Sequence, residues 1–142
     1  FELVSLARFD SRRALRWRLG GPDRKIVEGC IRLCRIQSLS GRRVEELSGG
    51  ELQRAWLAFG LAQEKRFLLL DETLDGLDVL AKQSFFSLLK EAAGKDRGIV
   101  LTSHDLDQVT EFAGTVIALS GGRVTYSGPP GVDLRRLLAC GA

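Results

Sequence analysis

Two short apolar segments with a helical segment between them constrain the fold of this chain most strongly. The first is the run Phe67–Leu70, the second is Gly98–Thr102, and Val79–Ala93 between them repeats apolar residues at helical spacing. A short continuous apolar run predicts a strand buried on both faces of a parallel sheet. Strand, helix and strand over this length predict a right-handed βαβ unit, so we expect an α/β fold.

Periodicity elsewhere divides the chain into a helical front portion, residues 1–64, and an α/β back portion, residues 65–142. The front portion is expected to hold an amphipathic run and two helices, at Phe1–Phe9, Asp23–Cys34 and Glu51–Gln63. In the last of these, Leu52, Ala55, Trp56 and Phe59 are expected to lie on one face of the helix. The back portion is expected to continue with a helix, two strands joined at Gly121–Gly122 and a last helix, at Leu106–Phe112, Thr115–Leu119, Arg123–Tyr126 and Leu134–Ala139.

Charge and composition narrow the class of protein. The chain has 142 residues and a net charge of +3, with arginines crowded near its beginning at Arg8, Arg12, Arg13, Arg16 and Arg18. These arginines form either an ordinary solvated face or a surface for anionic lipid headgroups or a membrane partner. Few aromatic residues interleave them, so nucleic acid is not expected as a partner. No apolar run approaches the ~20 residues of a membrane-spanning helix, and three sparse cysteines suit a reducing cytoplasm.

A glycine pair precedes the helix expected at Glu51–Gln63, in the turn Leu47-Ser48-Gly49-Gly50-Glu51. Ser48 and Glu51 have the spacing of a capping box, which accounts for those two residues alone. Adjacent glycines at a helix start let an anion approach exposed amide groups, where the helix dipole favours negative charge. The turn therefore predicts either plain capping or phosphate binding.

Asp71 and Glu72 end the first apolar run, at the edge of an open parallel sheet where ligands bind. Asp71 suits Mg²⁺, directly or through water, and Glu72 could orient or deprotonate an attacking water. The alternative is a surface turn with two solvated acids. His104 follows the second run and should reach the same edge, where its imidazole could bond a phosphate oxygen. Its alternative is an incidental place in a helix-capping loop.

The loop Asp75-Gly76-Leu77-Asp78 leads from this corner to the next helix. Capping explains Asp78 well but leaves Asp75 and Gly76 unexplained. We therefore expect Asp75 and Gly76 to meet a second subunit.

In this order, Leu47–Glu51, Phe67–Glu72, Asp75–Asp78 and His104 resemble the ATP-binding-cassette (ABC) ATPases, over about residues 1–130. The resemblance implies a partial P-loop NTPase-type parallel sheet, with a helical signature subdomain in front and a β-hairpin at the end. It implies that Leu47, Ser48, Gly49, Gly50 and Glu51 grip ATP bound mainly by an opposite subunit. It also implies that Asp71 holds Mg²⁺, Glu72 is the catalytic base, His104 contacts the γ-phosphate, and Asp75, Gly76 and Asp78 lie at the subunit interface.

Finer similarity points to importers of iron siderophores, haem and vitamin B12, through Gln53–Ala58, Leu61–Gln63 and His104–Gln108. The resemblance implies a cytoplasmic ATPase on the inner face of the membrane, paired head-to-tail with a second ATPase subunit and docked on transmembrane permease subunits. ATP and Mg²⁺ are the implied cofactors. Two alternatives stay open: a non-catalytic regulatory or binding module on a degenerate cassette, and a soluble ABC-type ATPase of DNA repair.

Three departures from the family pattern qualify the resemblance. The sequence contains no G-x-x-x-x-G-K-[ST] loop, which cradles the β- and γ-phosphates. Thr73-Leu74 replaces the usual Pro-Thr, and Glu51 stands where these importers more often carry glutamine. We therefore expect a fragment that has negligible ATPase activity alone and leaves strand edges and apolar faces bare.

Overall fold

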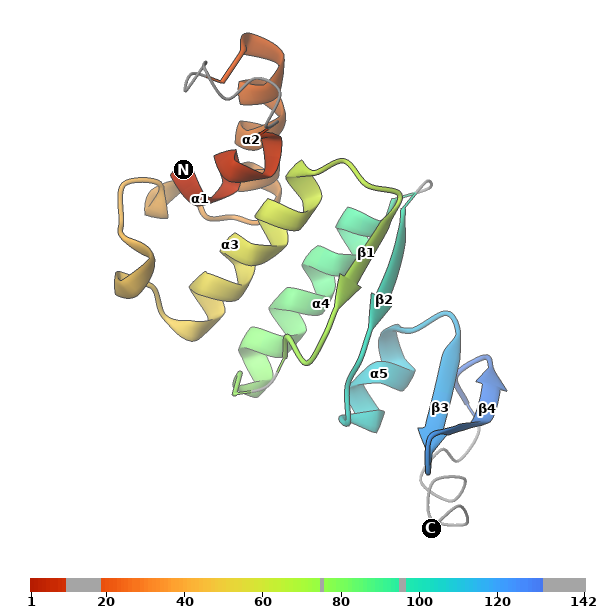
Figure 1. Cartoon of the computed structure of the whole chain (residues 1–142). Helices are drawn as coiled ribbons and strands as arrows, with labels where there is room; N and C mark the ends of the chain where they lie inside the picture. Colours follow the sequence, from red (N-terminus) through yellow and green to blue (C-terminus); the bar gives the residue numbers. More distant parts are fainter. Residues whose placement is uncertain (10–18, 75, 95–96, 132–142) are drawn as a thin grey trace. The chain divides into compact units, whose positions relative to one another are not determined.

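The computed structural model describes residues 1–9, 19–74, 76–94 and 97–131. The chain divides into two compact units, Phe1–Leu101 and Thr102–Ala142 (Figure 1). The boundary predicted between residues 64 and 65 falls inside the first unit and stays a prediction. Among the described helices, none combines the length and the hydropathy that a membrane span requires.

Helices build the front of the first unit. Two short helical turns, α1 (Glu2–Ser5) and η1 (Leu6–Arg8), precede α2 (Gly21–Leu33) and α3 (Gly49–Ala62), with short 3-10 turns between the last two. Pro22 lies in the first turn of α2, where its missing N–H costs no hydrogen bond. Helix α3 contacts both α1 and α2. The two longer helices predicted for the front portion are therefore confirmed, with ends shifted by one or two residues.

Arg8 ties these helices together. Its Nε donates to Asp23 Oδ1 (2.8 Å), in the first turn of α2, and its Nη1 donates to Glu64 Oε2 (2.8 Å) and to the carbonyl oxygen of Ala62 (3.1 Å), at the end of α3. The hydrogen bond to Asp23 is the main reason that the pKa of Arg8 lies above its ordinary value. One guanidinium thus joins the start of α2 to the end of α3.

Helix α3 buries an arc that overlaps only in part with the apolar face read from the sequence. Ala55 of that face is buried, but Trp56 is 50% exposed, and its ring meets the Phe59 ring edge-on at 5.7 Å. The fully buried arc instead runs through Leu57, Ala58, Leu61 and Ala62. Helix α3 packs against α2 on one side and α4 on the other (Figure 1). These two contacts bury this arc, and Trp56 lies outside it.

The predicted βαβ unit is present. Strand β1 (Phe67–Leu70) pairs in parallel with β2 (Gly98–Leu101), and α4 (Val79–Ala93) connects them. Phe85, Phe86, Leu88 and Leu89 of α4 are buried. Gly60 of α3 permits a close approach to β1, since a Cβ there would lie 2.7 Å from Leu68 Cδ1.

One face of the β1–β2 pair is exposed. Phe67, Leu69 and Val100 are 68%, 74% and 52% exposed, respectively. The expectation that Phe67–Leu70 forms a strand buried on both faces is therefore wrong for the described residues. Leu70, on the opposite face, is buried, so the described helices cover only one side. The result agrees with the expectation of a bare apolar face.

The second unit is a short helix followed by a hairpin. Helix α5 (Leu106–Phe112) has the predicted bounds, and β3 (Val116–Ser120) pairs antiparallel with β4 (Arg123–Gly128). Gly121 and Gly122 have φ values of 56° and 74°, which suit a two-residue hairpin turn that few side chains tolerate. The predicted last helix, residues 134–139, lies outside the described residues.

Candidate functional site

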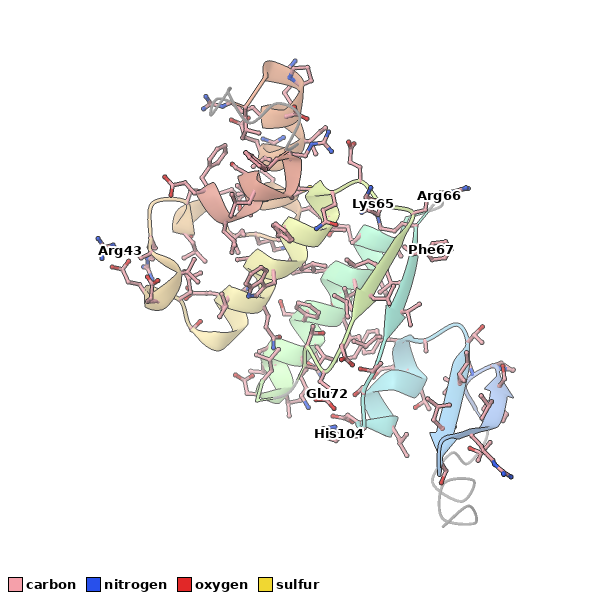
Figure 2. All side chains as sticks on the ribbon, in the orientation of Figure 1. Arg43, Lys65, Arg66, Phe67, Glu72 and His104 are labelled. Atoms are coloured by element: carbon pink, nitrogen blue, oxygen red, sulfur yellow. The ribbon has the colours of Figure 1, made fainter. Side chains whose placement is uncertain are left out.

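The candidate site begins at the carboxyl ends of β1 and β2. Leu70 pairs with Leu101, so both strands end at one edge of the sheet, as predicted. Asp71 and Glu72 are exposed just beyond β1, and Figure 2 places Glu72 past the end of this strand. His104, also exposed, follows Leu101 by three residues but belongs to the second unit. Its convergence with Glu72 therefore remains a prediction.

The backbone at Glu72 has an unusual conformation. Its φ is 47°, in the left-handed region, which costs a residue other than glycine roughly 1–2 kcal/mol. Leu74 is only 2% exposed and anchors the turn that follows, and the Leu77 N–H donates to the Leu74 carbonyl oxygen at 3.3 Å. Strain of this kind is held by surrounding structure and concentrates at functional sites. Glu72 thus has a left-handed backbone at the strand end, two residues before the buried Leu74.

Thr73, next to Glu72, carries a buried polar atom without a hydrogen-bond partner. No acceptor or donor in the described structure reaches its Oγ1. A buried hydroxyl normally takes a partner such as an ordered water, so this corner carries a polar position beside the buried Leu74.

The turn Leu47–Glu51 forms a complete capping box at the start of α3. The Ser48 N–H donates to Glu51 Oε2 (2.9 Å), and the Glu51 N–H donates to Ser48 Oγ (3.4 Å). The capping interpretation is therefore confirmed, with α3 beginning at Gly49 rather than Glu51. The N–H groups of Gly49 and Gly50 lie in the first turn, where a helix supplies no acceptor. Capping thus occupies Ser48 and Glu51 and leaves the glycine amides for an anion.

The capping carboxylate makes a pH-dependent contribution to stability. The backbone hydrogen bond from Ser48 is the main reason that the pKa of Glu51 lies below its ordinary value. A lowered folded-state pKa contributes stability that is complete above the unfolded pKa, about 4.3, and is lost as the pH falls through the folded value.

We expect Glu51→Gln to lower the melting temperature at pH 7, with a difference from wild type that shrinks as the pH falls below about 4. Glutamine keeps an acceptor for the Ser48 N–H but loses the charge. Thermal melts between neutral and acidic pH measure this difference. Glu45→Gln, an exposed acid of the preceding turn, is the control. A Glu51→Gln difference that stays constant with pH would contradict the assignment.

The glycine turn and the loop Gly76–Asp78 lie together in the first unit. A Cβ on Gly50 would lie 3.7 Å from Leu77 Cδ2 and 3.9 Å from Ala81 Cβ. Gly76 has a φ of 75°, and Asp78 Oδ1 accepts the Ala81 N–H at 2.8 Å, which confirms Asp78 as the cap of α4. Asp75 lies outside the described residues. Sequence analysis missed Leu77, whose only signal was an apolar residue inside a polar loop.

A small cavity of about 40 Å³ lies at this contact, and a larger open hollow lies elsewhere. The small cavity is lined by Gly50, Arg54, Leu77, Ala81, Ser84 and Phe85. The larger one, about 470 Å³, is lined by Glu64, Lys65, Arg66, Ala92, Ala93, Gly94 and Arg97. Lys65 and Arg66 precede β1 (Figure 2), so the hollow lies at the amino ends of the strands. Open parallel sheets bind ligands at the opposite, carboxyl end of the strands. The larger volume of this hollow therefore does not identify it as the ligand site.

The carboxylates at the carboxyl ends of β1 and β2 suit Mg²⁺ only when a phosphate ligand supplies further oxygen atoms. Among the described residues, no group of three or more His, Cys, Asp or Glu side chains gathers to hold a metal ion. Mg²⁺ in nucleotide sites takes one or two carboxylates and completes its shell with phosphate oxygens and water. Exposed Asp71 therefore fits a nucleotide-bound ion rather than a metal site of the protein alone.

Curated proteins similar to this chain are ATP-binding proteins of transport or import systems. The Escherichia coli ferric enterobactin transport ATP-binding protein FepC is 36% identical over 132 residues, which cover 91% of this chain and 48% of FepC. The Bacillus anthracis petrobactin import ATP-binding protein FpuC is 32% identical, covering 91% of this chain and 47% of FpuC. The chain thus spans about half the length of these relatives. No family model matches it.

Solved structures give the same fold. CbiO1 of Clostridium perfringens, part of the ABC transporter complex cbiONQ, is 26% identical with a TM-score of 0.78, covering 96% of this chain and 53% of cbiO1. A putative metal-chelate type ABC transporter in an inward-facing conformation gives 0.79 at 23% identity, over 90% of this chain and 51% of that chain. The predicted α/β fold, a partial P-loop NTPase-type domain, is confirmed.

Proposed function

Because this chain belongs to the ABC ATPase family over most of its length, we propose that it is part of the ATP-hydrolysing subunit of a transporter. The observation that carries the proposal is the common edge of β1 and β2, where Leu70 pairs with Leu101 and the strained Glu72 follows Asp71. By analogy with the names of its relatives, we propose that the transporter imports an iron chelate or a similar cargo.

Each residue at this edge has a chemical role in the proposal. Asp71 holds Mg²⁺, directly or through water, and the ion when bound neutralises charge on phosphate oxygens. Glu72 orients a water molecule and accepts its proton as the water oxygen bonds to the γ-phosphorus, while the bond from that phosphorus to the bridging oxygen breaks and ADP leaves. His104 donates a hydrogen bond to an oxygen of the γ-phosphate. Fixing Glu72 at the strand end favours this role, because positioning supplies much of the catalysis in phosphoryl transfer.

The glycine turn serves a second ATPase subunit in this proposal. Two copies pair head-to-tail, and Leu47, Ser48, Gly49, Gly50 and Glu51 of one copy close on the ATP held mainly by the other. The exposed amides of Gly49 and Gly50 at the start of a 14-residue helix support phosphate contact. Asp75, Gly76 and Asp78 lie at the interface of the pair. The adjacency of Gly50 and Leu77 supports joint movement of the turn and this loop.

The subunit acts at the cytoplasmic face of the membrane, docked on transmembrane permease subunits. Residues 1–64 form the helical subdomain that meets the permease, and residues 65–142 belong to the ATPase core. The phosphate-binding loop, which is absent from these 142 residues, has to come from another segment of polypeptide. ATP hydrolysis therefore requires that segment.

A chimera with FepC tests the proposal. The chain replaces the segment of FepC that it matches, so that FepC supplies the phosphate-binding loop. We expect negligible ATP turnover from the chain alone and steady Mg²⁺-dependent turnover from the chimera. A chimera that folds and binds ATP but does not hydrolyse it, beside active FepC, would contradict an ATPase role and favour a regulatory module.

A further inference from the structure

Positive charge is concentrated in the first part of the sequence. Residues 1–43 hold eleven lysines and arginines against four acidic residues, whereas residues 44–142 hold ten against fourteen. The modest net charge of +3 thus conceals a basic front portion and an acidic remainder. Such asymmetry points to an anionic contact on one side of the molecule.

On the outer side of α2, three basic residues remain unbalanced. Lys25 and Arg32 lie two turns apart on this helix, and Arg35 follows its end; all three are exposed. Glu28, the acidic residue among them, accepts a hydrogen bond from Arg24 at 2.9 Å. Within the part of the chain that the structure describes, Lys25, Arg32 and Arg35 have no ion-pair partner. We call these three residues the basic face.

The geometry of α2 places Lys25 and Arg32 on its outer side. Val27 and Ile31 are buried on the inner side of the helix, and Cys34 is fully buried where it ends. Residues seven apart in a helix lie about 10.5 Å apart along its axis and on the same side. Lys25 and Arg32 can therefore meet one flat surface together, and exposed Arg35 follows just after the helix end.

Aromatic and apolar side chains lie close to this helix. The Arg24 guanidinium is 6.0 Å from the centroid of the Phe1 ring, which is 37% exposed. Leu6 and Phe9, from the segment that Arg8 fastens to the start of α2, are 61% and 58% exposed. Basic residues beside exposed aromatic and aliphatic groups are the composition of surfaces that lie on anionic bilayers.

We propose that the basic face is a contact surface for anionic lipid headgroups, which holds this side of α2 against a negatively charged bilayer independently of nucleotide. A planar bilayer can meet Lys25 and Arg32 together, and charges more than a Debye length, about 8–10 Å, from the lipid contribute little to the contact. Single-stranded nucleic acid is usually bound in grooves where aromatic rings interleave the cations, whereas Phe1 and Phe9 lie on the segment before α2 and not among Lys25, Arg32 and Arg35.

Vesicle flotation of the whole chain tests this proposal, because protein aggregates do not float. The probe is vesicles of phosphatidylcholine with phosphatidylglycerol at about one third, against phosphatidylcholine alone. We expect flotation with the anionic vesicles in about 0.1 M salt and its loss at about 1 M, where the Debye length falls to about 3 Å. Each basic residue near the surface contributes roughly a fivefold factor to partitioning.

Substitution of the basic face should abolish this binding. The triple variant Lys25→Gln, Arg32→Gln and Arg35→Gln is expected to partition at least tenfold more weakly. The matched control replaces Lys65, Arg66 and Arg123 by glutamine, which removes the same charge from exposed positions elsewhere. The charge-preserving pair Arg32→Lys and Arg35→Lys should bind as wild type does. Circular dichroism of every variant establishes that the helices are intact.

Several outcomes would overturn the proposal. Equal flotation with neutral and anionic vesicles would remove the electrostatic basis, and equal losses in the triple variant and its control would assign binding to net charge. Failure of the folded wild-type chain to float would also refute it, as would retention of single-stranded RNA without vesicle binding. These results are separable from the ATPase proposal, because flotation is measured without nucleotide.

Discussion

Glu72→Gln is expected to lower ATP turnover of the FepC chimera by roughly 10²- to 10⁴-fold, the contribution of a positioned general base. Glutamine has nearly the same shape and can still hydrogen-bond a water molecule, but it cannot take the proton at the ordinary pH of the assay. Because Glu72 is exposed beyond β1, its replacement should leave the fold and nucleotide binding intact. Steady-state phosphate release measures the turnover, and equilibrium binding of ATP measures the retained affinity.

Glu91→Gln is the control for this result, since Glu91 is an exposed carboxylate of α4 away from the carboxyl ends of the strands, where Glu72 lies. We expect the Glu91→Gln chimera to turn over ATP at the unmodified rate. If Glu72→Gln hydrolyses ATP within about threefold of the unmodified chimera, a difference below 1 kcal/mol in activation free energy, Glu72 is not the base. Another group would then have to activate the water.

Leu57→Ala is expected to lower the free energy of unfolding by about 2–5 kcal/mol, the range for a large residue removed from a packed core. Leu57 is 1% exposed, in the middle of α3, and its side chain fills space that neighbouring helices cannot close without moving. Urea unfolding followed by circular dichroism measures the loss. The same helix begins at Gly49, so the substitution should also loosen the glycine turn.

Trp56→Ala is the matched control, one residue away on the same helix. Half of the Trp56 side chain is exposed, and its edge-on contact with Phe59 is worth about 0.5–1.5 kcal/mol. We therefore expect a loss of about 1 kcal/mol, clearly smaller than that of Leu57→Ala. A larger loss for Trp56→Ala than for Leu57→Ala would contradict the packing of α3.

Local signals in the sequence predicted elements whose ends are set locally. Phe67–Leu70, Val79–Ala93 and Leu106–Phe112 have the predicted bounds. The Asp78 side chain caps α4, and the charged residues Arg66 and Asp71 flank the apolar run of β1. The start of α3 was missed by two residues, because Gly49 and Gly50 adopt helical angles once Ser48 caps them.

Features that depend on distant neighbours were not predictable in the same way. Trp56 suits a buried helical face in sequence, but the packing of α3 between α2 and α4 turned a different arc inward. Phe67 and Leu69 suit a fully buried strand, yet their face is uncovered in the described structure. The contact between Gly50 and Leu77 joins residues 27 positions apart, and no local pattern encodes it.

The candidate site likewise has features that local sequence predicted and features that it did not. The capping box of Ser48 and Glu51 and the common end of β1 and β2 are confirmed. The left-handed backbone of Glu72 gave no sequence signal, since glutamate rarely adopts it. The roles of Asp71, Glu72 and His104 and of the interface loop stay predictions, because they depend on a nucleotide and a second subunit.

A structure of the Glu72→Gln chimera with ATP and Mg²⁺ would show whether these residues meet on one nucleotide. We predict His104 within hydrogen-bonding distance of a γ-phosphate oxygen, about 3 Å, and Asp71 beside the ion or one of its waters. We also predict the Gly49 and Gly50 amides of the opposite copy on the same nucleotide. ATP bound with His104 and residue 72 on opposite rims of the sheet, or with the glycine turn remote from both nucleotides, would contradict this prediction.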